Sequence, residues 1–288
     1  MTSVGSETDS RSAVTNADQK TVEGFGDDWA RFDQSGASET QTKAIFDQYF
    51  KIFPWSKLPD GAVGFDLGCG SGRWARLVAS RVGKLHCIDA SEEALAVAAR
   101  NLASSPNCEL HHASVDAIPL ADGAMDFGYS LGVLHHVPDT LAGIEACVAK
   151  LKPGAPFLVY LYYAFDNRPR WFRAVWRASD LARRVVSRMS PTARYAMSQA
   201  LAAGVYYPLA RTSALLERAG LPVETIPLSA YRNLSFYFMR NDALDRFGTR
   251  LEQRFTADQI RGMLIAAGLV RVEVSDSLPY WCAVGFKA

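Results

Sequence analysis

The stretch VGFDLGCGSGRW at residues 63–74 joins a short apolar segment to a turn that contains three glycines. Residues 63–67 have the length and composition of a buried strand, and Trp74, Leu77 and Val78 recur at helical spacing after the turn. Glycines between a strand and a helix let the backbone approach a ligand closely. The stretch therefore predicts an α/β domain with a ligand-binding turn.

The spacing of these glycines disfavours a dinucleotide ligand and with it an NAD-dependent oxidoreductase. The dinucleotide fingerprint GxGxxG needs a glycine three residues after Gly70, where Arg73 stands. An acid, Asp66, precedes the turn, which disfavours a pyrophosphate and suits a cationic ligand. A second acid, Asp89, follows the next predicted strand, at the place where an acid holds ribose hydroxyls.

On both sides of this stretch, short apolar runs alternate with helical patterns over residues 62–163, which is typical of βαβ units. Strands are predicted over residues 63–67, 84–88, 108–112, 126–130 and 157–162. Helices are predicted after residue 74, after a Ser91 cap and over residues 141–151, with a loop over 131–137. Thr256 and Gln259 form a capping-box pattern that opens a further helix. Two final strands are predicted over 270–274 and 281–286.

Four motifs resemble the class I S-adenosylmethionine-dependent methyltransferases, specifically the UbiE-like small-molecule branch. They are FDLGCGSGRW (65–74), LHCIDAS (85–91), DAIPLADGAMDFGYSLGVLHHVPD (116–139) and LKPGAPFLVY (151–160). The resemblance implies a doubly wound, seven-stranded Rossmann-like α/β sheet in the order 3-2-1-4-5-7-6, with the ligand at its topological switch point. It also implies S-adenosyl-L-methionine as the cofactor and methyl transfer as the reaction.

The resemblance also implies a set of cofactor-binding residues. It places the glycines of the turn against the methionine part, Asp89 at the ribose, Asp116 and Ala117 beside the adenine, and Leu131 near the sulfonium. The full set is Asp66, Gly68, Gly70, Asp89, Asp116, Ala117 and Leu131. Asp116 read alone is equally consistent with a turn aspartate. Trp29 and Phe32 are expected either to fold over the ligand or to belong to an entry helix.

His135 and His136 are the candidates for a general base, because they follow the fourth predicted strand and a hydroxyl acceptor needs a group that takes its proton. The alternative is that one of them packs against the next helix. His111 and His112 are expected to be structural. No set of Asp, Glu and His shows metal-ligand spacing, so no metal is predicted.

Residues 164–250 are predicted to be a helical insert that covers the substrate. Residues 168–189 combine arginines with apolar side chains, which is typical of a membrane-surface helix, of a site for a phosphorylated substrate, or of an ordinary surface helix. Seven arginines stand there against one acid, at positions 168, 170, 173, 177, 183, 184 and 188. The candidates for acceptor binding are Tyr162, Tyr163, Tyr231, Arg232 and Tyr280.

The predicted function is methyl transfer to a small or lipid-linked metabolite, with a hydroxyl oxygen as the favoured acceptor. A carbon or nitrogen acceptor and a non-catalytic sensor or scaffold with this fold remain alternatives. Only the arginine stretch would support an RNA substrate. Methylation of nucleic-acid amino groups is disfavoured, because no Asn/Asp-Pro-Pro motif follows the fourth predicted strand. Protein-arginine methylation is disfavoured, because no paired-glutamate loop stands there either.

Composition bounds the remaining choices. The 288 residues have a net charge of +1, which predicts no DNA partner, and five widely spaced cysteines, which suggest a reducing cytoplasm. Neither a signal peptide nor a membrane-spanning run is evident, and a homodimer is left open. The expected organisation is a disordered tail (1–20), a helical segment with order from about Phe25 (21–61), a cofactor core (62–163), the helical cap (164–250) and the end of the core (251–288).

Overall fold

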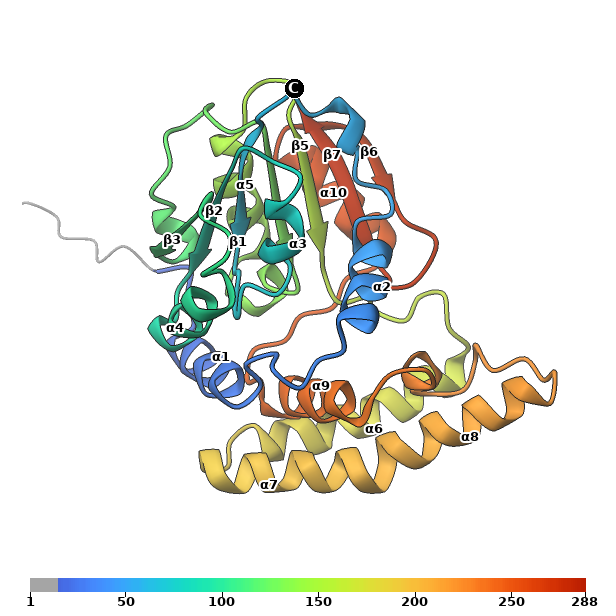
Figure 1. Cartoon of the computed structure of the whole chain (residues 1–288). Coiled ribbons are helices and arrows are strands. Elements are labelled where there is room, and N and C mark those ends of the chain that lie inside the picture. The colour runs from blue at the N-terminus through green and yellow to red at the C-terminus, as the bar shows by residue number, and fades with distance from the viewer. Residues whose placement is uncertain (1–14) are drawn as a thin grey trace, which may run out of the picture.

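The computed structural model describes residues 15–288 and contains the seven-stranded sheet that the motifs implied (Figure 1). Its strand order is β3-β2-β1-β4-β5-β7-β6, with β1 to β5 parallel and β7 antiparallel to both neighbours. The strands are β1 (Val63–Leu67), β2 (Lys84–Asp89), β3 (Cys108–His112), β4 (Phe127–Leu131), β5 (Pro156–Tyr160), β6 (Leu269–Val274) and β7 (Cys282–Lys287).

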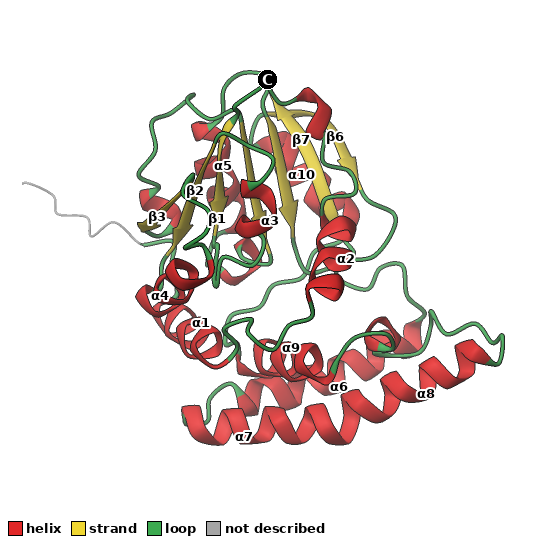
Figure 2. Ribbon diagram, viewed as in Figure 1, coloured by secondary structure: helices red, strands yellow, loops and turns green. Residues whose placement is uncertain are grey.

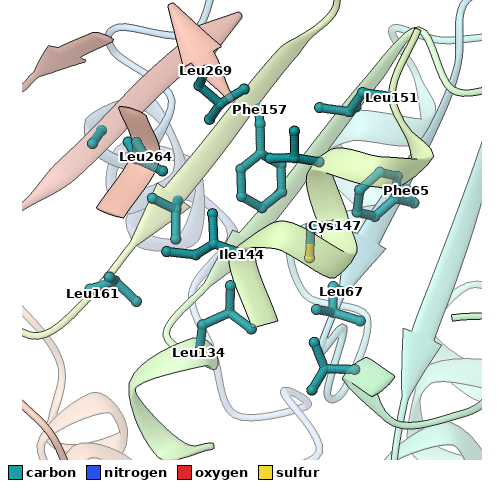
Figure 3. Packing of buried hydrophobic residues seen from close by; sticks show 14 of the residues in the cluster. Phe65, Leu67, Leu134, Ile144, Cys147, Leu151, Phe157, Leu161, Leu264 and Leu269 are labelled. Carbon is teal, nitrogen blue, oxygen red and sulfur yellow. The ribbon is translucent and has the colours of Figure 1, made fainter. Parts of the chain in front are cut away.

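Alternating side chains of these strands build one hydrophobic cluster on each face of the sheet. Phe65 and Phe157 belong to the cluster beneath α5 (Thr140–Lys150) and α10 (Ala257–Ala266), which Figure 3 shows. Phe127 and Tyr129 belong to the opposite cluster, beneath α2 (Glu39–Tyr49) and α3 (Ala75–Ala79). Both faces are therefore covered, which fixes the carboxyl ends of the parallel strands as the open edge for a site.

A layer of helices lies across that edge, as Figures 1 and 2 show. Its members are α6 (Arg170–Val186), α7 (Pro191–Leu201), α8 (Tyr207–Arg218) and α9 (Phe236–Gly248). The π-helical turn Ala202–Tyr206 joins α7 to α8. Val186, Tyr206, Met239 and Phe247 form a separate small core within this layer. The cap thus has its own hydrophobic packing and does not merely extend the core of the sheet.

The N-terminal segment is ordered earlier than the sequence suggested. Residues 1–14 of the expected tail lie outside the described part of the chain, but α1 (Gln19–Arg31) begins six residues before Phe25. Asp18 caps this helix by accepting from the Thr21 amide, and Asn16 bonds to the loop before α5 through the backbone of Asp139. The expected onset of order was wrong because the local cap of Asp18 was not recognised and because the partner of Asn16, Asp139, is distant in sequence.

Other strand boundaries in the structure differ from the predicted ones by one or two residues. β4 runs from Phe127 instead of Asp126, whose carboxylate accepts from the Val63 amide and from Lys152. β5 ends at Tyr160, two residues before the predicted end. Ser91 caps α4 (Glu92–Asn101), and the capping box of Thr256 and Gln259 is present at α10.

Candidate active site

The glycine turn after β1 needs glycine for two independent reasons at two positions. Gly68 and Gly70 have φ angles of +76° and +52°, in the left-handed region that other residues rarely adopt. A Cβ on Gly68 would lie 2.3 Å from a methyl of Val133, and a Cβ on Gly70 would lie 2.8 Å from the Trp29 ring. The turn is therefore closed against two other segments.

Asp89 fixes the relative position of the first two strand ends. One carboxylate oxygen accepts from the Gly70 amide at 2.8 Å, and the other accepts from the Ser91 amide at 2.9 Å. Burial raises the pKa of Asp89, while these backbone hydrogen bonds act in the opposite direction. Each oxygen keeps a further lone pair, so the carboxyl group can also accept from the hydroxyls of a ligand.

A cavity opens beside this carboxyl group, at the carboxyl ends of β1, β2 and β4 and beneath α1. Four of the predicted residues line it, namely Gly68, Asp89, Leu131 and His136. Apolar side chains from the strand ends and the following loops, among them Leu67, Val115, Val133 and Val137, form much of the wall. Thr21, Val22, Phe25 and Trp29 of α1 line the side toward the N-terminal helix. The result is a mostly apolar site with two acidic residues, Asp89 and the helix cap Asp18.

Trp29 and Phe32, which were expected to act together, have different places. Trp29 lines the cavity and covers Gly70, and Arg73 lies over its ring at 5.7 Å. Phe32 is buried and packs edge-on against Tyr237 of the cap. The covering residue is therefore Trp29, while Phe32 anchors the helix.

Asp66 does not line this cavity. Its side chain is buried within the sheet, one carboxylate oxygen has no hydrogen-bond partner among the described residues, and burial raises its pKa to about 8. At neutral pH the group therefore carries a proton. Asp66 cannot supply the negative charge that the sequence pattern suggested for a cationic ligand, because the strand places it inside the hydrophobic layer.

Asp116 and Ala117 are exposed and do not line the cavity; they belong to the short 3-10 turn Val115–Ala117, of which Val115 lines the cavity together with the preceding Ser114. The Asp116 carboxylate accepts from the Asn16 amide at 3.1 Å and from the Ser114 hydroxyl. These hydrogen bonds lower the pKa of Asp116, with the Ser114 hydroxyl as the main cause. Asn16 thus supplies an N–H donor to the carboxylate that was expected to accept from an adenine amine.

The two candidate bases differ sharply. His136 lines the cavity, and its Nδ1 donates to the Leu251 carbonyl at 2.6 Å, which leaves Nε2 unprotonated in the neutral ring. No hydrogen bond to Nε2 occurs among the described residues, and burial lowers the pKa of His136. His135 is fully buried between the rings of His136 and Tyr162, and both its ring nitrogens are without partners there. The geometry favours His136.

An acidic group that the sequence did not single out stands next to this histidine. Asp245 of α9 accepts from the Tyr162 hydroxyl at 2.6 Å, and its carboxylate acts to raise the pKa of His136 against the effect of burial. Its second oxygen has no partner within residues 15–288. Asp242, one helical turn earlier, has its pKa raised to about 6 by burial and by Asp245. The cap therefore contributes two buried carboxyl groups of α9 whose pKa values are raised.

The five predicted acceptor residues do not gather at one place. Tyr162 is beside His135 and Asp245, and Tyr231 packs on Tyr206 within the cap, where Asp242 helps burial to raise its pKa. Tyr163 and Tyr280 pack on each other in a separate aromatic cluster. Arg232 pairs with Glu217 at 2.7 Å and donates to the Ser229 carbonyl. Only Tyr162 is near the candidate base, and Arg232 is engaged in holding the cap.

The arginines of residues 168–189 divide into two groups. Arg183 is buried, pairs with Asp180 at 2.7 Å and donates to the Thr249 and Arg250 carbonyls. Arg184 shares the same acid at 2.9 Å. The remaining arginines of α6, at 170, 173 and 177, form no ion pair within the described chain. Some arginines of the stretch therefore hold α6 to the segment after α9, and others form an unpaired basic surface.

Comparison with known proteins points to one domain type. Residues 65–154 match the family model described as "Methyltransferase domain". Relatives include Phosphoethanolamine N-methyltransferase 2 of Caenorhabditis elegans, 30% identical over 121 residues, and a Ubiquinone biosynthesis O-methyltransferase of Aromatoleum aromaticum, 34% identical over 91 residues. A Demethylmenaquinone methyltransferase of Bacillus licheniformis is 29% identical over 108 residues.

These alignments cover 31% to 41% of this chain and only 28% to 46% of the relatives. Two solved structures share the fold. An O-methyltransferase family protein of Burkholderia thailandensis has a TM-score of 0.51 at 15% identity, over 92% of this chain and 58% of the other. A putative methyltransferase of Bacillus halodurans has a TM-score of 0.50 at 14% identity, over 81% of this chain and 72% of the other. The similarity in sequence is thus centred on the cofactor half of the sheet.

Proposed function

Residues 65–154 form the core of a class I S-adenosylmethionine-dependent methyltransferase domain of the UbiE-like type, and from this we propose that the whole chain methylates a small or lipid-linked acceptor beneath its helical cap. The observation that carries the proposal is the cavity at the carboxyl ends of β1, β2 and β4. It joins Gly68, Asp89 and Leu131 to His136 in one site under Trp29.

The cavity suits S-adenosylmethionine by the chemistry of its walls. Asp89 offers free lone pairs for the ribose hydroxyls, and Val115 and Val137 offer an apolar surface to the adenine. Gly68 lines the cavity with backbone atoms alone, which lets the methionine part approach the turn closely. When bound, the cofactor supplies an electrophilic methyl group. The protein aligns it with the acceptor and excludes water, and Trp29 closes the side toward α1.

We propose His136 as the general base for a hydroxyl acceptor. The Leu251 carbonyl holds the ring through Nδ1, so that Nε2 is free to take the hydroxyl proton while the oxygen forms its bond to the methyl carbon. Because burial lowers the pKa of His136, the ring is in its basic form at neutral pH. Asp245 then faces the imidazolium that results.

An amine acceptor is the second candidate, favoured by the two carboxyl groups of α9. Burial raises the pKa of both Asp242 and Asp245, Asp245 raises that of Asp242 further, and two such carboxyl groups attract an ammonium group. One relative carries the name of an N-methyltransferase. An amine that reaches the site unprotonated needs no base, so the two candidates differ in their need for His136.

The test uses His136→Asn, because the asparagine side-chain nitrogen can replace Nδ1 as the donor to Leu251 while nothing replaces Nε2. Wild type and variant are first titrated calorimetrically with S-adenosylmethionine and S-adenosylhomocysteine, then assayed with methyl-labelled cofactor on phenols, alcohols and amines. We expect both proteins to bind the cofactor, with kcat/KM for a hydroxyl acceptor about 100-fold lower in the variant or more.

His136→Gln, whose nitrogen replaces Nε2 instead, is the matched second variant. Equal turnover of a hydroxyl by His136→Asn and wild type would refute the base. Loss of activity on hydroxyls with activity on amines retained would support the base and show that an amine acceptor does not need it. Failure of the wild type to bind either cofactor would overturn the methyltransferase proposal itself.

We further propose that α6 brings the cap to an anionic membrane surface. Trp171, Val175, Leu181 and Val185 are large apolar residues on this helix that remain exposed, at 51% to 65%. Unpaired arginines on the same helix suit anionic headgroups. No helix within residues 15–288 is long and apolar enough to cross a bilayer, so the contact would be peripheral.

Vesicle sedimentation tests this surface. Wild type should sediment with phosphatidylglycerol-containing vesicles, less so at high salt, and only weakly with neutral phosphatidylcholine. The double variant Trp171→Ala, Val175→Ala should stay in solution, whereas the control Ile265→Ala removes an exposed apolar residue of α10 and should not matter. Equal sedimentation of all three proteins would contradict the proposal.

A further inference from the structure

Three metal-ligating side chains meet on one face of β2 and β3, away from the cavity. His86 stands opposite Glu109 in the register of the two parallel strands, and His111 follows Glu109 by two residues on the same face. The ligand atoms of all three residues lie within 4.8 Å of one another. The donor set is two imidazoles and one carboxylate, a combination that catalytic zinc sites also use.

The distances between these atoms match a tetrahedral metal site closely. His86 Nδ1 is 2.9 Å from His111 Nε2, and each nitrogen is 3.7 Å from an oxygen of Glu109. For metal–nitrogen bonds of about 2.0 Å, tetrahedral geometry separates two ligand atoms by about 3.3 Å. The observed separations lie on both sides of this value, so small side-chain rotations would bring all three donors to one ion.

The surroundings of the three donors also suit an ion. His86 is 8% exposed, so its ring is held in place by the surrounding side chains. Glu109 is about half exposed, which gives an ion access from solvent. Lys84 opposes binding, because its Nζ is 2.6 Å from a Glu109 oxygen.

We propose that His86, Glu109 and His111 bind one divalent transition-metal ion, with Zn²⁺ as the representative ion, and that a fourth position faces solvent. The site joins the edge strand β3 to β2. The sequence pattern predicted no metal and a structural His111, because its ligands are split between two strands and only the pairing register brings them together. This inference is independent of the methyltransferase proposal.

The experiment uses the full chain without an affinity tag, dialysed against a chelator and then titrated with ZnCl2 by calorimetry. We expect saturable binding of one ion per chain, and at least tenfold weaker binding by His86→Ala and by His111→Ala. Lys84→Gln should bind Zn²⁺ more tightly than wild type, because Glu109 loses its competing partner. Circular dichroism checks that each variant is folded.

His112→Ala is the matched control. His112 is the next residue along β3, points to the opposite face and contacts the Ala90 carbonyl and Glu92. Its removal should leave Zn²⁺ affinity unchanged. Zn²⁺ should also raise the unfolding temperature of the wild type but not that of His111→Ala. Absence of saturable binding, or equal affinity in wild type and both His→Ala variants of the site, would overturn the proposal and leave the cluster a polar edge of the sheet.

Discussion

Replacing Asp66 by asparagine tests whether the acid before the glycine turn is neutral in the folded protein. Its folded pKa of about 8 lies above the ordinary value of 3.8, so between these values the folded chain holds a proton that the unfolded chain has released. The stability of the wild type should therefore fall as pH rises, by about 1.4 kcal/mol per pH unit. Asparagine has no such proton.

The stability difference between Asp66→Asn and wild type should thus grow in favour of the variant by about 2.7 kcal/mol between pH 5 and pH 7, and level off above pH 8. Urea unfolding followed by circular dichroism at several pH values measures it. Asp116→Asn is the control, because its exposed carboxyl has a lowered pKa and should give a flat difference over the same range. A flat line for Asp66→Asn would refute the reasoning, since it would mean that Asp66 ionises normally inside the sheet.

Three further changes probe the site and the cap. Asp89→Ala removes the acceptor for two backbone amides and for the ribose, and should weaken S-adenosylmethionine binding about 100-fold by calorimetry; unchanged binding would exclude Asp89 from the site. Trp29→Ala uncovers Gly70 and should weaken S-adenosylmethionine binding about tenfold in the same titration; unchanged binding would mean that the indole only packs α1 against the domain. Arg183→Ala leaves Asp180 with Arg184 alone and removes the buried donor to the Thr249 and Arg250 carbonyls, and should lower the free energy of unfolding by about 3 kcal/mol, whereas exposed Arg177→Ala should change it by less than about 0.5 kcal/mol.

The cofactor half of the site could be predicted because its signals are local, and the strand order because the four motifs resemble a family whose sheet has that order. The residues before and after the turn at 68–72 carry the strand, the left-handed glycines and the helix within a dozen positions. Asp89 and Leu131 are ends of strands whose order the motifs imply, so their convergence follows from the topology.

The acceptor half could not be predicted, because it depends on contacts between segments far apart in the chain. Asp245 reaches His136 only because α9 lies under the strand ends, and Asn16 reaches Asp116 across a hundred positions. Tyr163 and Tyr280 looked equivalent to Tyr162 as tyrosines near strand ends, but they turn into a separate aromatic cluster. The aromatic residues near the strand ends indicated where an acceptor could bind, but the sequence gave no means of choosing among these tyrosines.

Burial makes the site and the sheet layer behind it less charged than the sequence suggests, and this affects the chemistry. Asp66 is protonated at neutral pH and His136 is neutral, both because burial disfavours their charged forms. In the proposed reaction with a hydroxyl, a positive charge is present on the donor before transfer and on His136 after it. Asp245 lies close to His136, and although burial raises the pKa of Asp245, a positive charge on His136 lowers it and favours the carboxylate. A preorganised negative group at the final position of the charge stabilises the transition state more than the ground state, so Asp245 would contribute to rate and not to cofactor affinity.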